Sequence, residues 1–276
     1  MVTIHKEPLC IRYKVNKVSC ASCCNLIYGV LLILLPYIIA YVTGGFWSSD
    51  ILAREQPFVR FRHEALVEAY ASSTSPSLIP LGWSSSAPLN SALGSTLRPS
   101  ELRAWTEDDD RNGRVESLVF SLRVPLGSDE RIHSVSLMLG LEVILDQATS
   151  LRMNSTVYVQ HSSPLPGLRS SQTADLLLES TRALRSSRQP ARAPCREAFW
   201  MLQTPTHPNG APSTIEEIHN RYLSLCNDTV RLRHDPPLWT PGLSDAYEME
   251  LRIRMKSQSL SVQPDLLEVI KFAFVQ

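Results

Sequence analysis

One acidic segment carries oxygen-bearing side chains spaced as in the first half of a calcium-binding loop. Asp108, Asp110 and Asn112 stand at alternate positions, and Gly113 follows them. Hard oxygen ligands at this spacing, before a glycine that permits a sharp turn, suit Ca²⁺. The twelfth position is Val119 rather than the glutamate that would bind the ion through both oxygens. The segment therefore also suits a plain acidic turn leading into a strand, and no other cofactor is indicated.

Four of the six cysteines lie before or at the start of a long apolar segment. Cys20, Cys23 and Cys24 stand where thiols next to a membrane can be acylated, although unmodified cysteines in a membrane helix fit the pattern too. A zinc site that adds Cys10 would lack the paired CxxC spacing of structural zinc sites.

The far side of the apolar segment carries features of an oxidising compartment. Cys195 and Cys226 are a candidate disulfide pair, provided that their Cα atoms approach within about 4.4 to 6.8 Å. Two N-glycosylation sequons begin at Asn154 and Asn227. A sequon is a surface acceptor in a secreted or exoplasmic domain.

The sequence carries no recognisable catalytic motif. Nucleophile-elbow, zinc-protease, phosphate-binding and dinucleotide-binding patterns are all absent, and His63-Glu64 lacks the second histidine of a zinc protease. The chain has 27 basic and 27 acidic residues, so it has no net charge and no footprint for nucleic acid. We expect neither an enzyme nor a small-molecule substrate.

An uncharged window from Val18 to Ser49 predicts a membrane anchor. Residues 26–47 would span roughly 33 Å as a helix, enough to cross a hydrocarbon core of about 30 Å. Basic residues outnumber acidic ones before the window, which places residues 1–25 in the cytoplasm and the rest outside. A cleaved signal peptide is the alternative, although its apolar region usually runs about 7 to 15 residues.

The remainder of the chain shows mainly the period-two alternation of β-strands. Apolar and polar residues alternate in segments 58–67, 118–124, 135–145, 151–159 and 249–255. This pattern predicts an exoplasmic, antiparallel, sandwich-like β domain over residues 48–264. Residues 48–56 are expected to form a short linker between the anchor and the first strand.

Helix is expected in only one place within this domain. Thr214 and Glu217 form a capping-box pattern before an apolar stripe, which predicts a short helix over residues 214–226. Residues 72–99 and 162–194 are rich in Ser, Pro and Arg, so we expect long loops there.

Several strings, in order, resemble one family. The quoted blocks are GFWSSDILAREQPFVRFRHEALV, EDDDRNGRVESLVFSLRVPL, LCNDTVRLRHDPPLW and VQPDLLEVIKFAFVQ. Together they are similar to the transmembrane protein 231 family of the ciliary transition zone. The Ser/Pro-rich segments and the leader show little of this resemblance.

The resemblance implies a non-enzymatic component of the Meckel syndrome, or tectonic-like, complex at the ciliary base. Such proteins help to limit exchange between the ciliary and plasma membranes, and their partners are other membrane proteins of the complex and the bilayer. The residues alone leave two alternatives open. One is a cell-surface receptor or adhesion module, and the other is a tethered lumenal enzyme.

The family pattern includes a second membrane helix after the KFAFVQ block. Residues 265–276 supply an apolar helix start, but at about 1.5 Å per residue they reach only about 18 Å. We therefore expect either a truncated second crossing or a single-pass protein.

Overall fold

The N-terminal helix α1 (Cys20–Val42) is apolar along its length and contains Pro36. It is long and apolar enough to cross a membrane, and its apolar window is fully exposed. The expected anchor began at residue 26, whereas the helix already includes Cys20, because small residues such as Cys, Ala and Ser are compatible with a helical first turn. Residues 43–47, the expected end of the anchor, lie outside the described residues.

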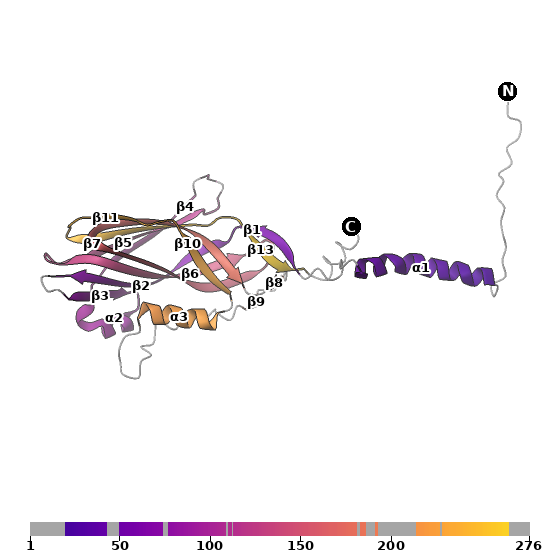
Figure 1. Ribbon diagram of the computed structural model, residues 1–276, viewed down its shortest axis with the longest axis horizontal. Coiled ribbons are helices and arrows are strands. Elements are labelled where there is room, and N and C mark those ends of the chain that lie inside the picture. The colour runs from indigo at the N-terminus through magenta and orange to yellow at the C-terminus, as the bar shows by residue number, and fades with distance from the viewer. Residues whose placement is uncertain are drawn as a thin grey trace, which may run out of the picture. The chain divides into compact units, whose positions relative to one another are not determined.

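The computed structural model describes residues 20–42, 50–73, 77–108, 110–111, 113–180, 183–185, 191–192, 214–226 and 228–264. The chain divides into two units, one with α1 and one comprising Asp50–Asp265. The second unit is the β-rich domain (Figure 1).

The β-rich domain contains two sheets among its described residues. The large sheet has the order β3-β2-β6-β7-β12-β5-β4, with β9, β10 and β11 also paired to β7, and the small sheet has the order β1-β13-β8. The strands are β1 (Ile51–Glu55), β2 (Phe58–Ser72), β3 (Leu78–Ser84), β4 (Glu101–Glu107), β5 (Ser117–Pro125), β6 (Arg131–Leu145), β7 (Leu151–Ser180), β8 (Leu184–Arg185), β9 (Ala191–Arg192), β10 (Asp228–His234), β11 (Leu238–Pro241), β12 (Ala246–Arg254) and β13 (Gln258–Gln263).

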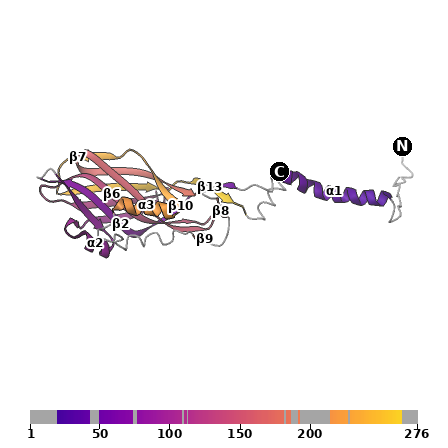
Figure 2. The ribbon, with the colours of Figure 1, turned by 60° about the horizontal axis from the view of Figure 1, so that its bottom comes forward.

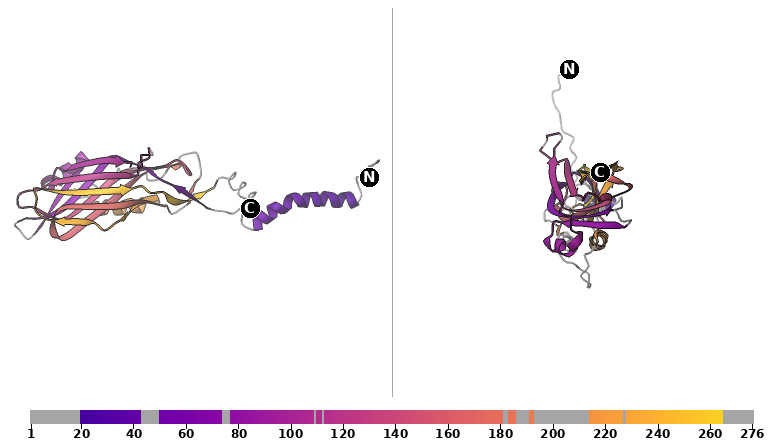
Figure 3. Two further views of the ribbon diagram at one scale, coloured as in Figure 1. Left: turned by 90° about the horizontal axis from the view of Figure 1, so that it is seen from above. Right: turned by 90° about the vertical axis from the view of Figure 1, so that its left-hand side faces the viewer.

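The large sheet curls because β7 changes partners along its length. Residues up to Gly167 pair with β6, and residues from Gly167 onward pair with β10, β11 and β12. Pro164 and Pro166 stand at the change. The curl brings the Phe61 ring of β2 edge-on to the Phe120 ring of β5, with their centroids 5.0 Å apart. Figure 3 shows the strands running along the length of the domain around this core.

The mainly β class is confirmed: four of the five predicted strand segments lie within a strand, and the fifth, 249–255, extends one residue beyond the end of β12 at Arg254. Most pairings are antiparallel as expected, but β12 with β7, β13 with β8, and β9 with β7 are parallel. The core is aliphatic: Leu137, Leu139, Leu141 and their neighbours on β6 are fully buried.

The two predicted loops are wrong over much of their length. Residues 72–99 contain β3 and the short helix α2 (Ala87–Leu93), and β7 continues through Ser180. Pro80 is tolerated because β3 is an edge strand, where a missing N–H breaks no second ladder. In β7, polar residues such as Ser170 and Gln172 are buried. Counting only large apolar residues therefore underestimates how much of this strand lies in the core. The expected linker is also partly wrong, since β1 occupies Ile51–Glu55.

The predicted helix is confirmed as α3 (Ile215–Leu225). Its capping box is present: the Thr214 hydroxyl accepts from the Glu217 N–H, and the Glu217 carboxylate accepts from the Thr214 N–H, both at 3.3 Å. Ile215 and Ile218 form a second apolar cluster with Leu66 of β2, Leu89 of α2 and Met138 of β6. This cluster fixes α3 against the outer face of the sheet (Figure 2).

Candidate functional site: a polar groove where the domain begins and ends

The first and last described strands of the β-rich domain pair with each other. β1 and β13 are antiparallel, with a register that runs from Ile51 opposite Val262 to Glu55 opposite Gln258. The chain therefore enters and leaves the described domain at neighbouring positions (Figure 1).

A buried carboxylate ties this entry strand to the core. Glu55 is 1% exposed. Its Oε1 accepts from the backbone N–H groups of Asp146 and Gln147, both at 2.8 Å, and its Oε2 accepts from that of Ala148 at 3.0 Å. These three residues connect β6 to β7. Hydrogen bonds to an ionised carboxylate are stronger than neutral ones, so this contact anchors β1 firmly.

The next residue extends the connection to the end of β12. Gln56 donates from Nε2 to the carbonyl oxygen of Met255 at 2.9 Å. The backbone N–H of Met255 in turn donates to the carbonyl of Glu116 at 2.8 Å. The segment between β12 and β13 is thus held from both sides.

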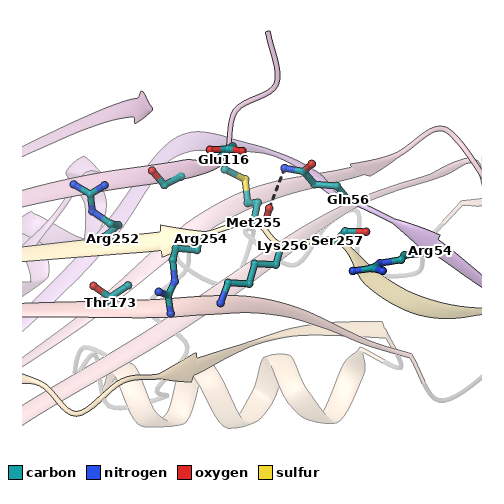
Figure 4. Close-up of a pocket in the computed structure, with 10 residues that line it drawn as sticks. Arg54, Gln56, Glu116, Thr173, Arg252, Arg254, Met255, Lys256 and Ser257 are labelled. Atoms are coloured by element: carbon teal, nitrogen blue, oxygen red, sulfur yellow. Dashed lines mark hydrogen bonds between the residues drawn. The ribbon is translucent and has the colours of Figure 1, made fainter. Parts of the chain in front are cut away.

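A groove of about 620 Å³ opens at this junction (Figure 4). Four cationic side chains line it together with Glu116 and several hydroxyl and amide groups: Arg54, Arg252, Arg254 and Lys256. Figure 4 shows that they come from β1, from β12 and from the segment after β12.

Three of the four cations have carboxylate partners. Arg254 contacts Asp175 at 2.6 Å, Lys256 contacts Asp175 at 2.9 Å, and Arg252 pairs with Glu107. Burial opposes the ionisation of Asp175, but the hydrogen bonds from Lys256 and Arg254 outweigh it and lower the pKa of that carboxyl.

Arg54 is the exception within the described part of the chain. It is exposed and forms no ion pair with any described residue. Among the described residues, Arg54 is thus the one cation of the groove without a carboxylate partner, beside a balanced set of charges, an arrangement suited to recognising a polar or acidic surface. Its lining contains no histidine or cysteine to act as a base or nucleophile.

The predicted calcium residues lie in the turn between β4 and β5. Asp108 Oδ2 accepts from the backbone N–H of Gly113 at 2.9 Å, and Gly113 has a φ of 82°. This bond is that of a plain acidic turn. Asp108 Oδ1 is shielded from solvent and has no hydrogen-bond partner among the described residues. Asp110 is described, but Asn112 lies outside the described residues, so calcium binding stays a prediction.

One of the two predicted glycosylation sites is buried. Asn154 lies on β7 and is 6% exposed, and the neighbouring Ser155 hydroxyl contacts the Tyr222 hydroxyl of α3 at 2.9 Å. The burial of Asn154 therefore argues against a glycan there, and glycosylation of Asn154 stays a prediction. The pattern alone misses this because a sequon carries no information on burial. Asn227 lies outside the described residues.

The cysteines divide as expected into free and oxidised ones. Cys20, Cys23 and Cys24 are free and exposed. Cys226 is disulfide-bonded. Cys195, its expected partner, lies outside the described residues, so the pairing stays a prediction. Among the described residues, no group of three His, Cys, Asp or Glu side chains is arranged to hold a metal ion.

Sequence reasoning missed the roles of Glu55 and Gln56. Both lie in the block AREQPF. The partners of Glu55 are 91 to 93 residues away along the chain, and the partner of Gln56 is 199 residues away. Local periodicity carries no signal for such contacts. The basic residues of β12 were recognised only as the solvent-facing side of a strand.

Comparison with known proteins identifies the family. The family model described as Transmembrane protein 231 matches residues 1–276. The relative from Xenopus tropicalis is 29% identical over 99% of this chain and 85% of its own length, and the one from Homo sapiens is 29% identical over 99% and 84%. The relative from Gallus gallus is 28% identical over 96% of this chain and 81% of its own. All three are named Transmembrane protein 231, and this chain, a membrane protein, belongs to the transmembrane protein 231 family.

Proposed function

We propose that this protein is a non-enzymatic membrane component of the ciliary transition zone. In this role it contributes to the diffusion barrier at the ciliary base, and thereby to ciliogenesis and to the composition of the ciliary membrane. Its partners are other membrane proteins of the Meckel syndrome, or tectonic-like, complex. The observation that carries the proposal is membership of the transmembrane protein 231 family over the whole chain.

The proposed topology has a cytoplasmic N-terminus and an exoplasmic β-rich domain. Two independent features support it. Basic residues dominate before α1. Cys226 is disulfide-bonded, and structural disulfides persist in oxidising compartments rather than in the cytosol.

The short connection between anchor and domain suits lateral assembly. Residues 43–50 separate α1 from β1, and even fully extended they reach at most about 29 Å. A domain on so short a tether stays near its own membrane. We propose that its exposed faces dock to neighbouring exoplasmic domains, while α1 packs among the membrane helices of the partners.

The groove at the β1–β13 junction is the surface we propose for docking. Among the described residues Arg54 is its one cation without a carboxylate partner, so an acidic patch on a partner protein would complement it. Replacing Arg54 by glutamate reverses this charge without touching the core. Arg103→Glu is a matched control, because Arg103 is also exposed but lies on edge strand β4, where it pairs with Glu101 of its own strand.

The test uses ciliated cells that lack the endogenous protein and are rescued with the tagged full chain. The expected result is signal at the ciliary base, co-purification of the named complex members, and exclusion of a plasma-membrane marker from the cilium. Arg54→Glu should reduce co-purification several-fold, and Arg103→Glu should not. Signal spread evenly over the plasma membrane, with no loss of exclusion when the protein is absent, would instead support a receptor or adhesion module.

A further inference from the structure

Three free thiols share one face at the start of the described part of α1. Cys20, Cys23 and Cys24 are all exposed and none is oxidised. Residues three and four apart are neighbours on a helix surface, so the three thiols lie on the same side of α1 and make up the cysteine cluster.

An apolar groove continues from this cluster along the same face. Ile27 and Leu31 follow Cys24 in steps of three and four, which keeps them in line with the thiols. Both line a shallow groove of about 380 Å³ whose lining is entirely aliphatic. The described lining residues are Leu26, Ile27, Val30, Leu31, Leu34 and Ile38. A hydrocarbon chain attached to one of the sulfurs would find apolar surface directly beside it.

The cluster also stands at the boundary between charged and apolar sequence. Lys14 and Lys17 precede it, and no charged residue occurs from Val18 to Ser49. Thiols at such a juxtamembrane position are the usual sites of reversible fatty acylation. The arrangement does not suit a metal site, since no described group of three potential ligands is placed to hold an ion.

We propose that Cys20, Cys23 and Cys24 are S-acylated by long-chain fatty acids. The proposal rests on the cytoplasmic N-terminus of the proposed function, because the donor, a long-chain acyl coenzyme A, is found on that side. The cysteine sulfur attacks the carbonyl carbon of the donor thioester and forms a new carbon–sulfur bond. The bond to coenzyme A breaks, and coenzyme A leaves as a thiol that carries the proton lost by cysteine. No oxidant or reductant is needed.

The test is an acyl-exchange assay on the full chain expressed in ciliated cells. Free thiols are blocked, thioesters are cleaved with hydroxylamine, and each released thiol is coupled to a polymer tag that shifts the band by one step. We expect up to three hydroxylamine-dependent steps. The Cys20→Ser/Cys23→Ser/Cys24→Ser variant should lose all of them, whereas Cys10→Ser should keep them.

Two results would overturn the proposal. One is the absence of hydroxylamine-dependent steps in the unaltered chain, and the other is their persistence in the triple variant. Alkaline extraction checks that the triple variant is still inserted in the membrane. Protease access to an N-terminal tag in permeabilised cells separates the two proposals: an accessible tag without acylation removes only this inference, whereas a protected tag removes the proposed topology as well.

Discussion

Gln56 donates a hydrogen bond from its side-chain nitrogen to the carbonyl oxygen of Met255, although 199 residues of chain separate them. Together with the β1–β13 ladder, this bond joins the two ends of the β-rich domain.

Glu55→Gln should destabilise the protein by about 2 kcal/mol. The variant keeps the size of the side chain but replaces one accepting oxygen by an amide nitrogen. At least one of the N–H groups of Asp146, Gln147 and Ala148 then lacks its acceptor in a buried site, which costs about 1 to 3 kcal/mol. Thermal unfolding of the detergent-solubilised full chain measures the loss.

The matched control for this variant is Glu101→Gln on β4. Glu101 pairs with Arg103 at the exposed edge of the sheet. Surface pairs of this kind contribute little, so the control should change stability by less than about 0.5 kcal/mol. Equal effects of the two variants would show that the buried contact does not anchor β1.

Gly167→Ala should destabilise the domain through a clash with Trp239. A Cβ atom at residue 167 would lie 2.2 Å from Cζ2 of the Trp239 ring, much closer than any stable contact. The Trp239 Nε1–H also donates to the carbonyl of Leu165 at 3.1 Å, so the ring is not free to move away. We expect a loss of about 1 to 3 kcal/mol, the range for overpacked cores.

A double-mutant cycle with Trp239→Phe tests the cause of that loss. The smaller ring lacks the atoms nearest to residue 167, so the alanine should cost less in this background. An unchanged cost would place the strain in the β7 backbone rather than in the ring contact.

Acidification should destabilise the domain through His161. This residue is 5% exposed, and its ring stacks on Trp239 at 5.1 Å. Burial lowers the pKa of His161 in the folded state. The unfolded chain therefore takes up a proton first as the pH falls through about 6.5, and folding stability decreases from there downward until the folded-state pKa is reached. Above that window His161 is neutral in both states and contributes nothing to the pH dependence.

The measurement compares melting temperatures at pH 7.5 and pH 5.5 in the unaltered chain and in His161→Gln. The variant should show a smaller decrease. Burial also lowers the pKa values of His219 and His234, so part of the decrease should remain. An identical decrease in both proteins would exclude His161 as a contributor.

Asp108→Ala should loosen the β4–β5 turn by about 1 kcal/mol, because it removes the acceptor of the Gly113 N–H. We expect millimolar Ca²⁺ to leave the melting temperature of the unaltered chain unchanged, since the carboxylate already serves the turn. The same thermal assay with and without a chelator decides the matter. A calcium-dependent rise that Asp108→Ala abolishes would instead establish a metal site.

Strands and the capped helix could be predicted because their signals are local. Alternation over β6 and β12, and the pairing of Thr214 with Glu217, each lie within a few residues. The second half of β7 could not, because its buried positions mix small or polar residues, such as Gly167, Ser170 and Gln172, with only a few larger apolar ones. Ser170 can lie in the core because its hydroxyl has a partner there, the Tyr247 hydroxyl, which donates to it at 2.6 Å. Tyr247 stands 77 residues later in the chain.

The groove escaped prediction for a related reason. Arg54 lies on β1 near the start of the domain and Lys256 follows β12 near its end, and the β1–β13 pairing and the Gln56–Met255 hydrogen bond bring them to the same groove. Composition showed a neutral chain but not where single charges lack partners. Sequence spacing therefore identified the elements, while contacts between distant residues define the candidate site.

The two sequons should behave differently in a glycosidase assay. Treatment of the full chain with a peptide N-glycosidase should reduce its mass by one glycan, and Asn227→Gln should remove that shift. Asn154→Gln should leave the shift unchanged, because Asn154 is buried in β7 and the Tyr222 hydroxyl of α3 contacts the neighbouring Ser155. A smaller glycosidase-dependent mass shift in Asn154→Gln would instead mean that Asn154 carries a glycan. This stretch of β7 would then have to be exposed, which would contradict the packing of α3 on the sheet.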